Sequence, residues 1–195
     1  LHRLTYTLPD YKLALLFHPL DFTQINLEMN RMMLNQAMNF LLPQPDETVL
    51  DLFCGIGNFT LPIARHAKRV VGIEGSLEMV ERARENSNYN DINNVDFYAA
   101  NLEALATSTN TAPWLDQQYD KILLDPPRVG AKAILPYFKQ FAAKQIVYIS
   151  CNPATLARDA GELVHQYGYK LSAVGVMNMF PHTAHIEAMA IFHKN

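Results

Sequence analysis

The sequence contains few of the residues that mark several large protein classes. Only two cysteines, Cys54 and Cys151, occur among its 195 residues, too few for a disulfide framework or a four-thiolate metal site. The longest apolar runs are short, and the N-terminus has no charged segment followed by an apolar core, so we expect neither a membrane span nor a signal peptide. These absences predict a protein of the reducing cytoplasm.

An excess of charge of either sign is also missing. The 16 basic and 19 acidic residues give a net charge of -3, so no strong general field attracts polyanions, and a nucleic-acid partner would have to be held by other means. With 195 residues and 49% hydrophobic content, the chain suffices for one sizeable core and falls short of two full domains. We expect a monomer.

The N-terminus suggests that the sequence was cut from a longer protein. It begins with Leu1 rather than Met and directly enters the strand-like stretch "LTYTLPDYKLALLF". We interpret residues 1–22 as a remnant of a preceding domain or linker, and residues 23–195 as a domain of their own.

Strand-like and helical segments alternate along most of this domain. A leading helix is predicted over residues 26–42, with Asn26 as its N-cap and Pro43 as its stop. Runs rich in β-branched and aromatic residues predict strands at 48–54, 69–74, 95–100, 119–125, 145–151, 169–177 and 185–193. Helices are predicted between them at 58–67, 76–88, 133–143 and 154–166, and residues 101–118 are predicted to be irregular.

This alternation predicts an α/β fold with a parallel sheet that helices cover on both faces. Only the stretch "NMFPHTA" separates the last two strands, too little for a helical crossover, so the last strand should run antiparallel. Five crossover-linked strands followed by a hairpin resemble the seven-stranded, Rossmann-like sheet of class I S-adenosylmethionine-dependent methyltransferases.

In open α/β sheets, ligands bind beyond the carboxyl ends of the strands, so candidate residues are sought there. The first parallel strand ends in "DLFCGIGNFT", in which Gly55 and Gly57 let the backbone approach a ligand, and the following helix N-terminus favours a carboxylate such as that of a methionine moiety. The third glycine of a dinucleotide motif is missing, which argues against NAD. A simple tight turn is the alternative interpretation.

Three polar residues could complete a cofactor site. Glu74 ends the second strand, where a carboxylate can accept hydrogen bonds from two ribose hydroxyls; the alternative is a solvated charge. Asn101 follows the third strand and could contact an adenine edge, or simply turn the chain. Gln24 precedes the leading helix and could close over the methionine end, or be an ordinary polar loop residue.

The fourth strand ends in "LLDPPRVG", with Asp125 at its tip and Arg128 after two prolines. A related Asp-Pro-Pro-aromatic turn in amino-methyltransferases holds an exocyclic amine. Arg128 in place of the aromatic residue argues against nitrogen as the methyl acceptor. A proline-rich turn with a salt bridge is the alternative.

Cys151 ends the fifth strand and should face the same crevice as Asp125. Most strand-end cysteines are buried apolar residues, but a thiolate beside a methyl donor can add to carbon 6 of a pyrimidine and make carbon 5 nucleophilic. We expect the following helix N-terminus and Arg128 to lower the pKa of this thiol from its usual value of ~8.5. Cys54, inside the glycine loop, is interpreted as a packing residue.

The proton on carbon 5 must then be removed by a base, and Glu187 is our candidate. Period-two alternation places Glu187 and Met189 on one face of an otherwise apolar last strand; a salt-bridged edge carboxylate is the alternative. His182 and His185 lack the helical spacing of zinc motifs, so we expect no metal and leave open whether they are structural or contact a base.

Taken together, the segments "FTQ", "DLFCGIGNFTLP", "GIEG", "LLDPPR", "SCNPATLARD" and "MFPHTAHIE" resemble the RNA uracil-5-methyltransferases, and among them the bacterial 23S rRNA branch. The resemblance covers roughly residues 20 to 195 and marks residues 23–195 as a methyltransferase catalytic domain. It implies Cys151 as the nucleophile, Glu187 as the base and S-adenosylmethionine as the cofactor. The residues that the resemblance implies as cofactor contacts are Gln24, Phe53, Asn58, Glu74, Asn101 and Asp125, and the glycine loop adds Gly55 and Gly57.

The resemblance also implies an RNA substrate, 23S rRNA, with an unpaired or flipped uridine. Pro127 departs from the Asp-Pro-Ala-Arg turn that this branch often has. Larger members carry an N-terminal oligonucleotide-binding domain and, in this branch, a cysteine-ligated iron–sulfur cluster, which we expect only outside this sequence. The alternatives are a cytosine-5 or tRNA uracil-5 methyltransferase, and a non-catalytic RNA-binding module that retains the fold.

Overall fold

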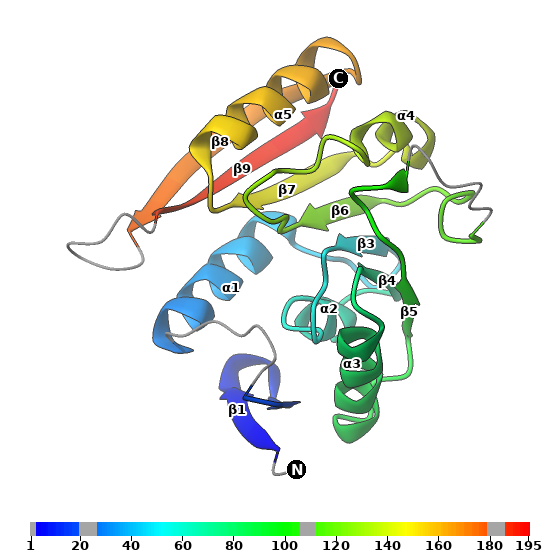
Figure 1. The fold of residues 1–195 in the computed structure, drawn as a ribbon, viewed down its shortest axis with the longest axis vertical. Coiled ribbons are helices and arrows are strands. Elements are labelled where there is room, and N and C mark those ends of the chain that lie inside the picture. Colours follow the sequence, from blue (N-terminus) through cyan, green and yellow to red (C-terminus); the bar gives the residue numbers. More distant parts are fainter. Residues whose placement is uncertain (1–2, 20–26, 106–111, 179–185) are drawn as a thin grey trace.

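A computed structural model of the chain (Figure 1) describes residues 3–19, 27–105, 112–178 and 186–195. Seven strands form one sheet in the order β5-β4-β3-β6-β7-β9-β8. The first five are parallel, and β9 lies antiparallel between β7 and β8. The strands are β3 (Thr48–Leu52), β4 (Arg69–Glu74), β5 (Val95–Ala99), β6 (Lys121–Leu124), β7 (Gln145–Ser150), β8 (Tyr169–Asn178) and β9 (Ile186–Lys194). The predicted sheet, including its antiparallel last strand, is confirmed.

The helices lie between these strands, mostly where the sequence pattern predicted them. None of those in the described ranges is long and apolar enough to cross a membrane. The segment predicted as one helix over 133–143 is instead a 3-10 turn that contains Pro136 and a short helix that ends at Phe141. The next residue, Ala142, has a left-handed φ of 53°. The helical elements are α1 (Leu27–Leu41), α2 (Thr60–Ala64), α3 (Leu77–Tyr89), η3 (Leu135–Tyr137), α4 (Phe138–Phe141) and α5 (Pro153–His165).

The sheet separates two hydrophobic cores, one on each face. Residues of β3 alternate between them: Val49 joins the core under α1, α2 and α3, whereas Leu50 joins the core under α4 and α5. On β9, Met189 packs into the first core and Ala188 into the second, which confirms the predicted alternation of this strand. Burial on both faces explains why the central strands are almost continuously apolar.

A hairpin of β1 (Leu4–Leu8) and β2 (Leu13–Phe17), joined by the 3-10 turn η1 (Pro9–Tyr11), precedes α1 and packs into the first core. The buried Asn86 of α3 binds the backbone of this hairpin in both directions: Leu16 N–H donates to its Oδ1 at 2.7 Å, and its Nδ2 donates to Leu16 O at 3.0 Å. The strand-like character predicted for the opening of the sequence is confirmed, the two strands form a hairpin, and its backbone is hydrogen-bonded to α3.

Candidate active site

Most of the described candidate residues meet at one edge of the sheet. Glu74, Asp125 and Cys151 lie at or just beyond the carboxyl ends of β4, β6 and β7, which run parallel. Glu187 lies near the start of β9, and β9 runs the other way, so it reaches the same edge. Its neighbour Ala188 pairs with Ser150, which places Glu187 beside Cys151. Candidate residues from four strands therefore meet at the edge where the sequence predicts a crevice.

The loop after β3 has an unusual backbone. Gly55 and Gly57 have φ angles of 54° and 95°, and Phe53 has a φ of 63°. A side chain on Gly57 would place its Cβ 3.3 Å from Leu61 Cγ. A non-glycine residue in the left-handed region costs about 1 to 3 kcal/mol. This strained, closely packed loop is a candidate ligand cradle.

Glu74 is oriented by two backbone amides. Gly55 N–H donates to its Oε2 at 3.1 Å, and Ser76 N–H donates to its Oε1 at 3.0 Å. An ionised carboxylate has about four acceptor positions, so each oxygen keeps one for another donor. This arrangement suits a ligand that offers two hydroxyls, as a ribose does.

Asp51 is a second carboxylate of this cradle, which the interpretation of the sequence missed. It is only 1% exposed at the end of β3, Thr60 Oγ1 donates to its Oδ2 at 2.5 Å, and its Oδ1 has no hydrogen-bond partner among the described residues. Burial raises its pKa to about 7, with a smaller contribution from Glu74. The available signal was an acid inside the apolar strand "TVLDL", which is costly without a function.

Asn58, predicted to bind a cofactor, is held by two residues that sequence reasoning did not identify. Its Oδ1 accepts from Tyr6 OH at 2.7 Å and from Asn30 Nδ2 at 3.0 Å, and its Nδ2 donates to Asn30 Oδ1 at 2.9 Å. Tyr6 belongs to the N-terminal hairpin and Asn30 to α1. The glycine loop is therefore held by hydrogen bonds from two elements, the hairpin and α1, that precede it in the sequence.

The other polar candidates are less closely defined. Asn101 is exposed, and its Oδ1 accepts from Glu103 N–H at 3.0 Å, the bond of a local turn. This leaves its amide nitrogen as the group that could donate to a base edge. Gln24, His182 and His185 lie outside the described residues.

Cys151 is half-buried, and the pKa of its thiol is raised rather than lowered. Burial contributes most, the carboxylates of Glu187 and Asp125 add to it, and Arg128 opposes it more weakly. The expectation of a lowered pKa is wrong for this structure because two acids approach the thiol as well as the helix N-terminus and the arginine. A positive charge brought close to these acids would oppose their effect and favour the thiolate.

The pKa values of both acids are raised as well. Burial raises the pKa of Asp125 well above its usual value, and Glu187 and Asp51 raise it further. Burial also raises the pKa of Glu187, whose Oε2 has no hydrogen-bond partner in the described part of the chain. No ion pair of Glu187 is found there either, so the alternative of a salt-bridged edge carboxylate has no support among these residues.

Cys54 behaves as a packing residue. It is 6% exposed in the first core, and burial raises the pKa of its thiol well above the usual value, with Asp51 and Glu74 adding to the shift.

Within the described ranges, no group of three His, Cys, Asp or Glu side chains could hold a metal ion.

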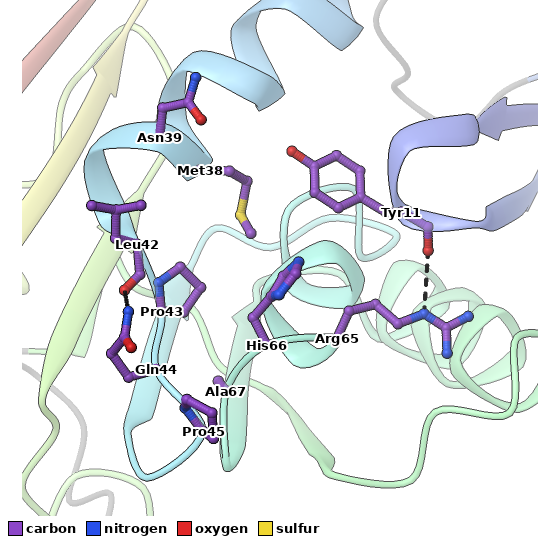
Figure 2. A pocket seen from close by; sticks show the side chains of 10 residues that line it. All are labelled: Tyr11, Met38, Asn39, Leu42, Pro43, Gln44, Pro45, Arg65, His66 and Ala67. Carbon is purple, nitrogen blue, oxygen red and sulfur yellow. Dashed lines mark hydrogen bonds between the residues drawn. The ribbon is translucent and has the colours of Figure 1, made fainter.

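An open hollow of about 660 Å³ lies elsewhere in the molecule (Figure 2). Its lining includes residues 42–45, which precede β3, and Ala67, which precedes β4, so it lies at the opposite end of the sheet from the crevice. The guanidinium of Arg65 at its rim already donates to Tyr11 O at 3.3 Å. None of the predicted site residues lines it, and ligands of parallel sheets bind at the other end.

Comparison with known proteins identifies the family of the chain. The model of the family described as tRNA (Uracil-5-)-methyltransferase matches residues 8–195. The chain is 58% identical over 193 residues to the 23S rRNA (uracil(1939)-C(5))-methyltransferase RlmD of Hahella chejuensis, covering 98% of this chain and 43% of that protein. It is 53% identical to the RlmD of Methylococcus capsulatus, covering 99% and 43%. The chain thus spans less than half the length of these relatives.

Solved structures give the same fold. The Pyrococcus abyssi tRNA (uracil-54, C5)-methyltransferase in complex with S-adenosyl-L-homocysteine superposes with a TM-score of 0.80 at 26% identity, covering 97% of this chain and 44% of that one. M. jannaschii TYW2 in complex with AdoMet superposes with a TM-score of 0.67 at 18% identity, covering 99% and 87%. The second similarity is one of fold alone.

Proposed function

The chain belongs to the tRNA (uracil-5-)-methyltransferase family and has the class I methyltransferase fold, and from this premise we propose that it methylates carbon 5 of a uridine in 23S rRNA with S-adenosylmethionine. The observation that carries the proposal is that Cys151 and Glu187 lie side by side, next to Asp125, at the edge that the glycine loop also reaches. The relatives at 53% and 58% identity are named for 23S rRNA.

The crevice fits S-adenosylmethionine by charge. Asp51 interacts electrostatically with both Glu74 and Asp125. The sulfonium and ammonium cations of the cofactor would offset the negative charge of these three acids. When bound, it supplies an electrophilic methyl carbon. We propose that Glu74 accepts from the ribose hydroxyls and that Asp125 lies near the methionine end. The other proposed contacts are Gln24, Phe53, Gly55, Gly57, Asn58 and Asn101.

Cys151 is the proposed nucleophile. A cation beside Asp125 offsets one of the two carboxylates that raise the pKa of the thiol, so cofactor binding favours the thiolate. The Sγ atom then bonds to carbon 6 of the uracil, and the electron pair of the 5,6 double bond moves toward the O4 enolate. Carbon 5 becomes nucleophilic and takes the methyl group, with S-adenosylhomocysteine as the leaving group.

Glu187 is the proposed base. It removes the proton from carbon 5, the 5,6 double bond forms again, and the bond between carbon 6 and Sγ breaks to release the product and the thiolate. Its burial and its unpartnered Oε2 suit a group that must receive a proton.

Reaching carbon 5 requires a uridine that is unstacked from its neighbours, so a loop or a flipped base is the proposed substrate. RNA affinity comes largely from phosphate contacts, and a domain of net charge -3 offers few. We therefore propose that other parts of the whole protein supply most of the RNA affinity.

Two cysteines are too few to ligate an iron–sulfur cluster, so we propose that any such cluster lies outside this sequence. We also propose that the enzyme acts as a monomer in the cytoplasm.

Methylation assays with the full-length protein test this function. We expect transfer of labelled methyl groups to a 23S rRNA transcript, recovered as 5-methyluridine, and none with Cys151→Ala. Cys54→Ala replaces the other cysteine and should keep the activity. Methylation of tRNA instead of rRNA would correct the substrate class, and product formation by Cys151→Ala would refute the mechanism.

A further inference from the structure

The loop that follows β6, residues 125–131 (the β6 loop), is hydrogen-bonded to the beginning of α5. Asn152, the N-cap of α5, donates from Nδ2 to Arg128 O at 2.9 Å, and Thr155 Oγ1 donates to the same oxygen at 3.1 Å. Because α5 begins directly after Cys151, these bonds join the loop to the segment that carries the proposed nucleophile.

A buried carboxylate completes this attachment. Asp159 is 0% exposed, and its Oδ2 accepts from Ala131 N–H at 2.7 Å and from Tyr148 OH at 2.6 Å. Its Oδ1 pairs with the guanidinium of Arg158 at 2.8 Å, and Arg158 Nη2 donates to Val129 O at 2.8 Å. The single side chain of Asp159 thus connects the β6 loop, the strand β7 and the helix α5.

Gly130 shows how closely the loop passes over this carboxylate. Its φ is 82°, and an added Cβ would lie 2.5 Å from Arg158 Nη2 and 2.7 Å from Asp159 Oδ2. Only glycine fits there without displacing the loop or the ion pair. The spacing of Gly130 after "DPPR" is explained by this contact.

The position of the β6 loop matters because it determines which charges the Cys151 thiol meets. The charged groups that act on it are Glu187 from β9, Asp125 at the start of the loop and Arg128 within it. Of the two that the loop carries, Asp125 has the larger effect and disfavours the thiolate, whereas Arg128 favours it. If the β6 loop moved away from Cys151, the loss of the Asp125 charge would outweigh the loss of the Arg128 charge, and the pKa of the thiol would fall.

We propose that Asp159 is a positioning residue of the methyl-transfer site: its buried carboxylate fixes the β6 loop against α5 and so sets the distances of Asp125 and Arg128 from the Cys151 thiol. The inference rests on the proposed function for its meaning in catalysis. The attachment itself is a property of the fold, and it can be tested without RNA or cofactor.

Alkylation of Cys151 by iodoacetamide in the full-length protein, measured by peptide mass spectrometry, reports its reactivity. Asp159→Asn keeps the side-chain volume and removes the charge that holds Arg158. We expect alkylation at pH 7 to become about threefold faster as Asp125 withdraws, while methyl transfer to RNA becomes at least about tenfold slower because the reacting groups lose their alignment. Because Cys151 is also partly buried, the alkylation rate is measured from pH 6 to pH 10. Loss of a nearby carboxylate moves the midpoint of this profile to lower pH, whereas greater access of the reagent alone raises the rate at every pH.

Gly130→Ala displaces the same loop from its other side and should change both rates in the same directions, also if Asp159→Asn does not fold. Asp120→Asn is the matched control, because Asp120 Oδ2 accepts from Thr48 N–H at 2.8 Å at the opposite end of the sheet; it should change neither rate. Unchanged alkylation in the folded Asp159→Asn and Gly130→Ala variants, or an equal change in Asp120→Asn, overturns the proposal. Absence of methylation by the unaltered protein overturns the proposed function alone.

Discussion

Glu187 and Cys151 lie side by side at the end of the antiparallel pair of β9 and β7, where Ala188 pairs with Ser150. The carboxylate of Glu187 raises the pKa of the Cys151 thiol. We propose that Glu187 removes the proton from carbon 5 in the last step. Its carboxylate also disfavours the Cys151 thiolate that the first step needs, until a positive charge enters the crevice. This relationship leads to predictions that separate the two roles.

Replacement of Glu187 by Gln should trap the reaction after methyl transfer. The amide cannot take the proton from carbon 5, so the bond between Cys151 and carbon 6 persists, and turnover should fall by about 10² to 10⁴. Denaturing gels of the full-length protein with ordinary 23S rRNA transcript and cofactor should show a covalent protein–RNA complex. Loss of turnover without this complex would mean that Glu187 acts before methyl transfer.

Asp51 should make the cofactor-free protein less stable as the pH rises. Its pKa is about 7 in the folded state and 3.8 when unperturbed, so between these values the folded protein binds more protons than the unfolded one. The free energy of unfolding then falls with rising pH. Urea unfolding of the domain should give a lower stability at pH 7.5 than at pH 5, and a saturating concentration of S-adenosylhomocysteine should reduce the difference.

Asp51→Asn provides the matched comparison for this pH effect. Asn can still accept the hydrogen bond from Thr60, but it has no charge to bury. At pH 7.5 we expect the cofactor-free variant to be more stable by about 1 to 3 kcal/mol and to bind S-adenosylhomocysteine more weakly. An unchanged pH dependence in this variant would assign the effect to another group.

The N-terminal hairpin should influence cofactor affinity through Tyr6. Tyr6→Phe removes the bond from its hydroxyl to Asn58 Oδ1 and should cost about 0.5 to 1.5 kcal/mol of stability. Tyr11→Phe removes a similar bond to Asn35 Oδ1, 2.8 Å long and away from the glycine loop. Calorimetry should show weaker S-adenosylhomocysteine binding for Tyr6→Phe only. Equal affinities in both variants would mean that the hairpin does not act on the cofactor loop.

Two glycines should respond in opposite ways to alanine. Gly57→Ala places a Cβ at a φ of 95° and against Leu61, so we expect a loss of about 1 to 3 kcal/mol and weaker cofactor binding. Gly161 lies inside α5 with no atom within 4 Å of an added Cβ. Gly161→Ala should stabilise the protein by about 0.5 to 1 kcal/mol with unchanged affinity. Thermal unfolding and calorimetry check both variants.

The sequence predicts the sheet well because its signals are local. Apolar runs, glycine loops and polar residues at strand ends mark the strands and their tips, and the short connection before the last strand requires it to be antiparallel. These signals place Glu74, Asp125, Cys151 and Glu187 at one edge, as the structure shows. They do not define the short helices, because Pro136 and the left-handed Ala142 break up a segment whose composition is helical.

The tertiary features of the site could not be predicted in this way. The partners of Asn58 come from the hairpin and from α1, 52 and 28 residues away along the chain. The pKa of Cys151 depends on two carboxylates that other strands bring toward it, and their combined effect exceeds that of the nearby Arg128. Asp159 is one acid among several in the sequence until the fold buries it. The partners of Asn58, the pKa of Cys151 and the burial of Asp159 all depend on which elements lie next to each other in the fold. A local sequence pattern does not carry this information.

A covalent trap tests the central claim most directly. The full-length protein, incubated with cofactor and 23S rRNA transcript that contains 5-fluorouridine, cannot complete the reaction, because fluorine at carbon 5 cannot leave as a proton does. Digestion and mass spectrometry should find the fluorinated, methylated nucleotide on the peptide that contains Cys151, and Cys151→Ala should give no adduct. An adduct on Cys54, or one that forms undiminished in Cys151→Ala, would contradict the assignment.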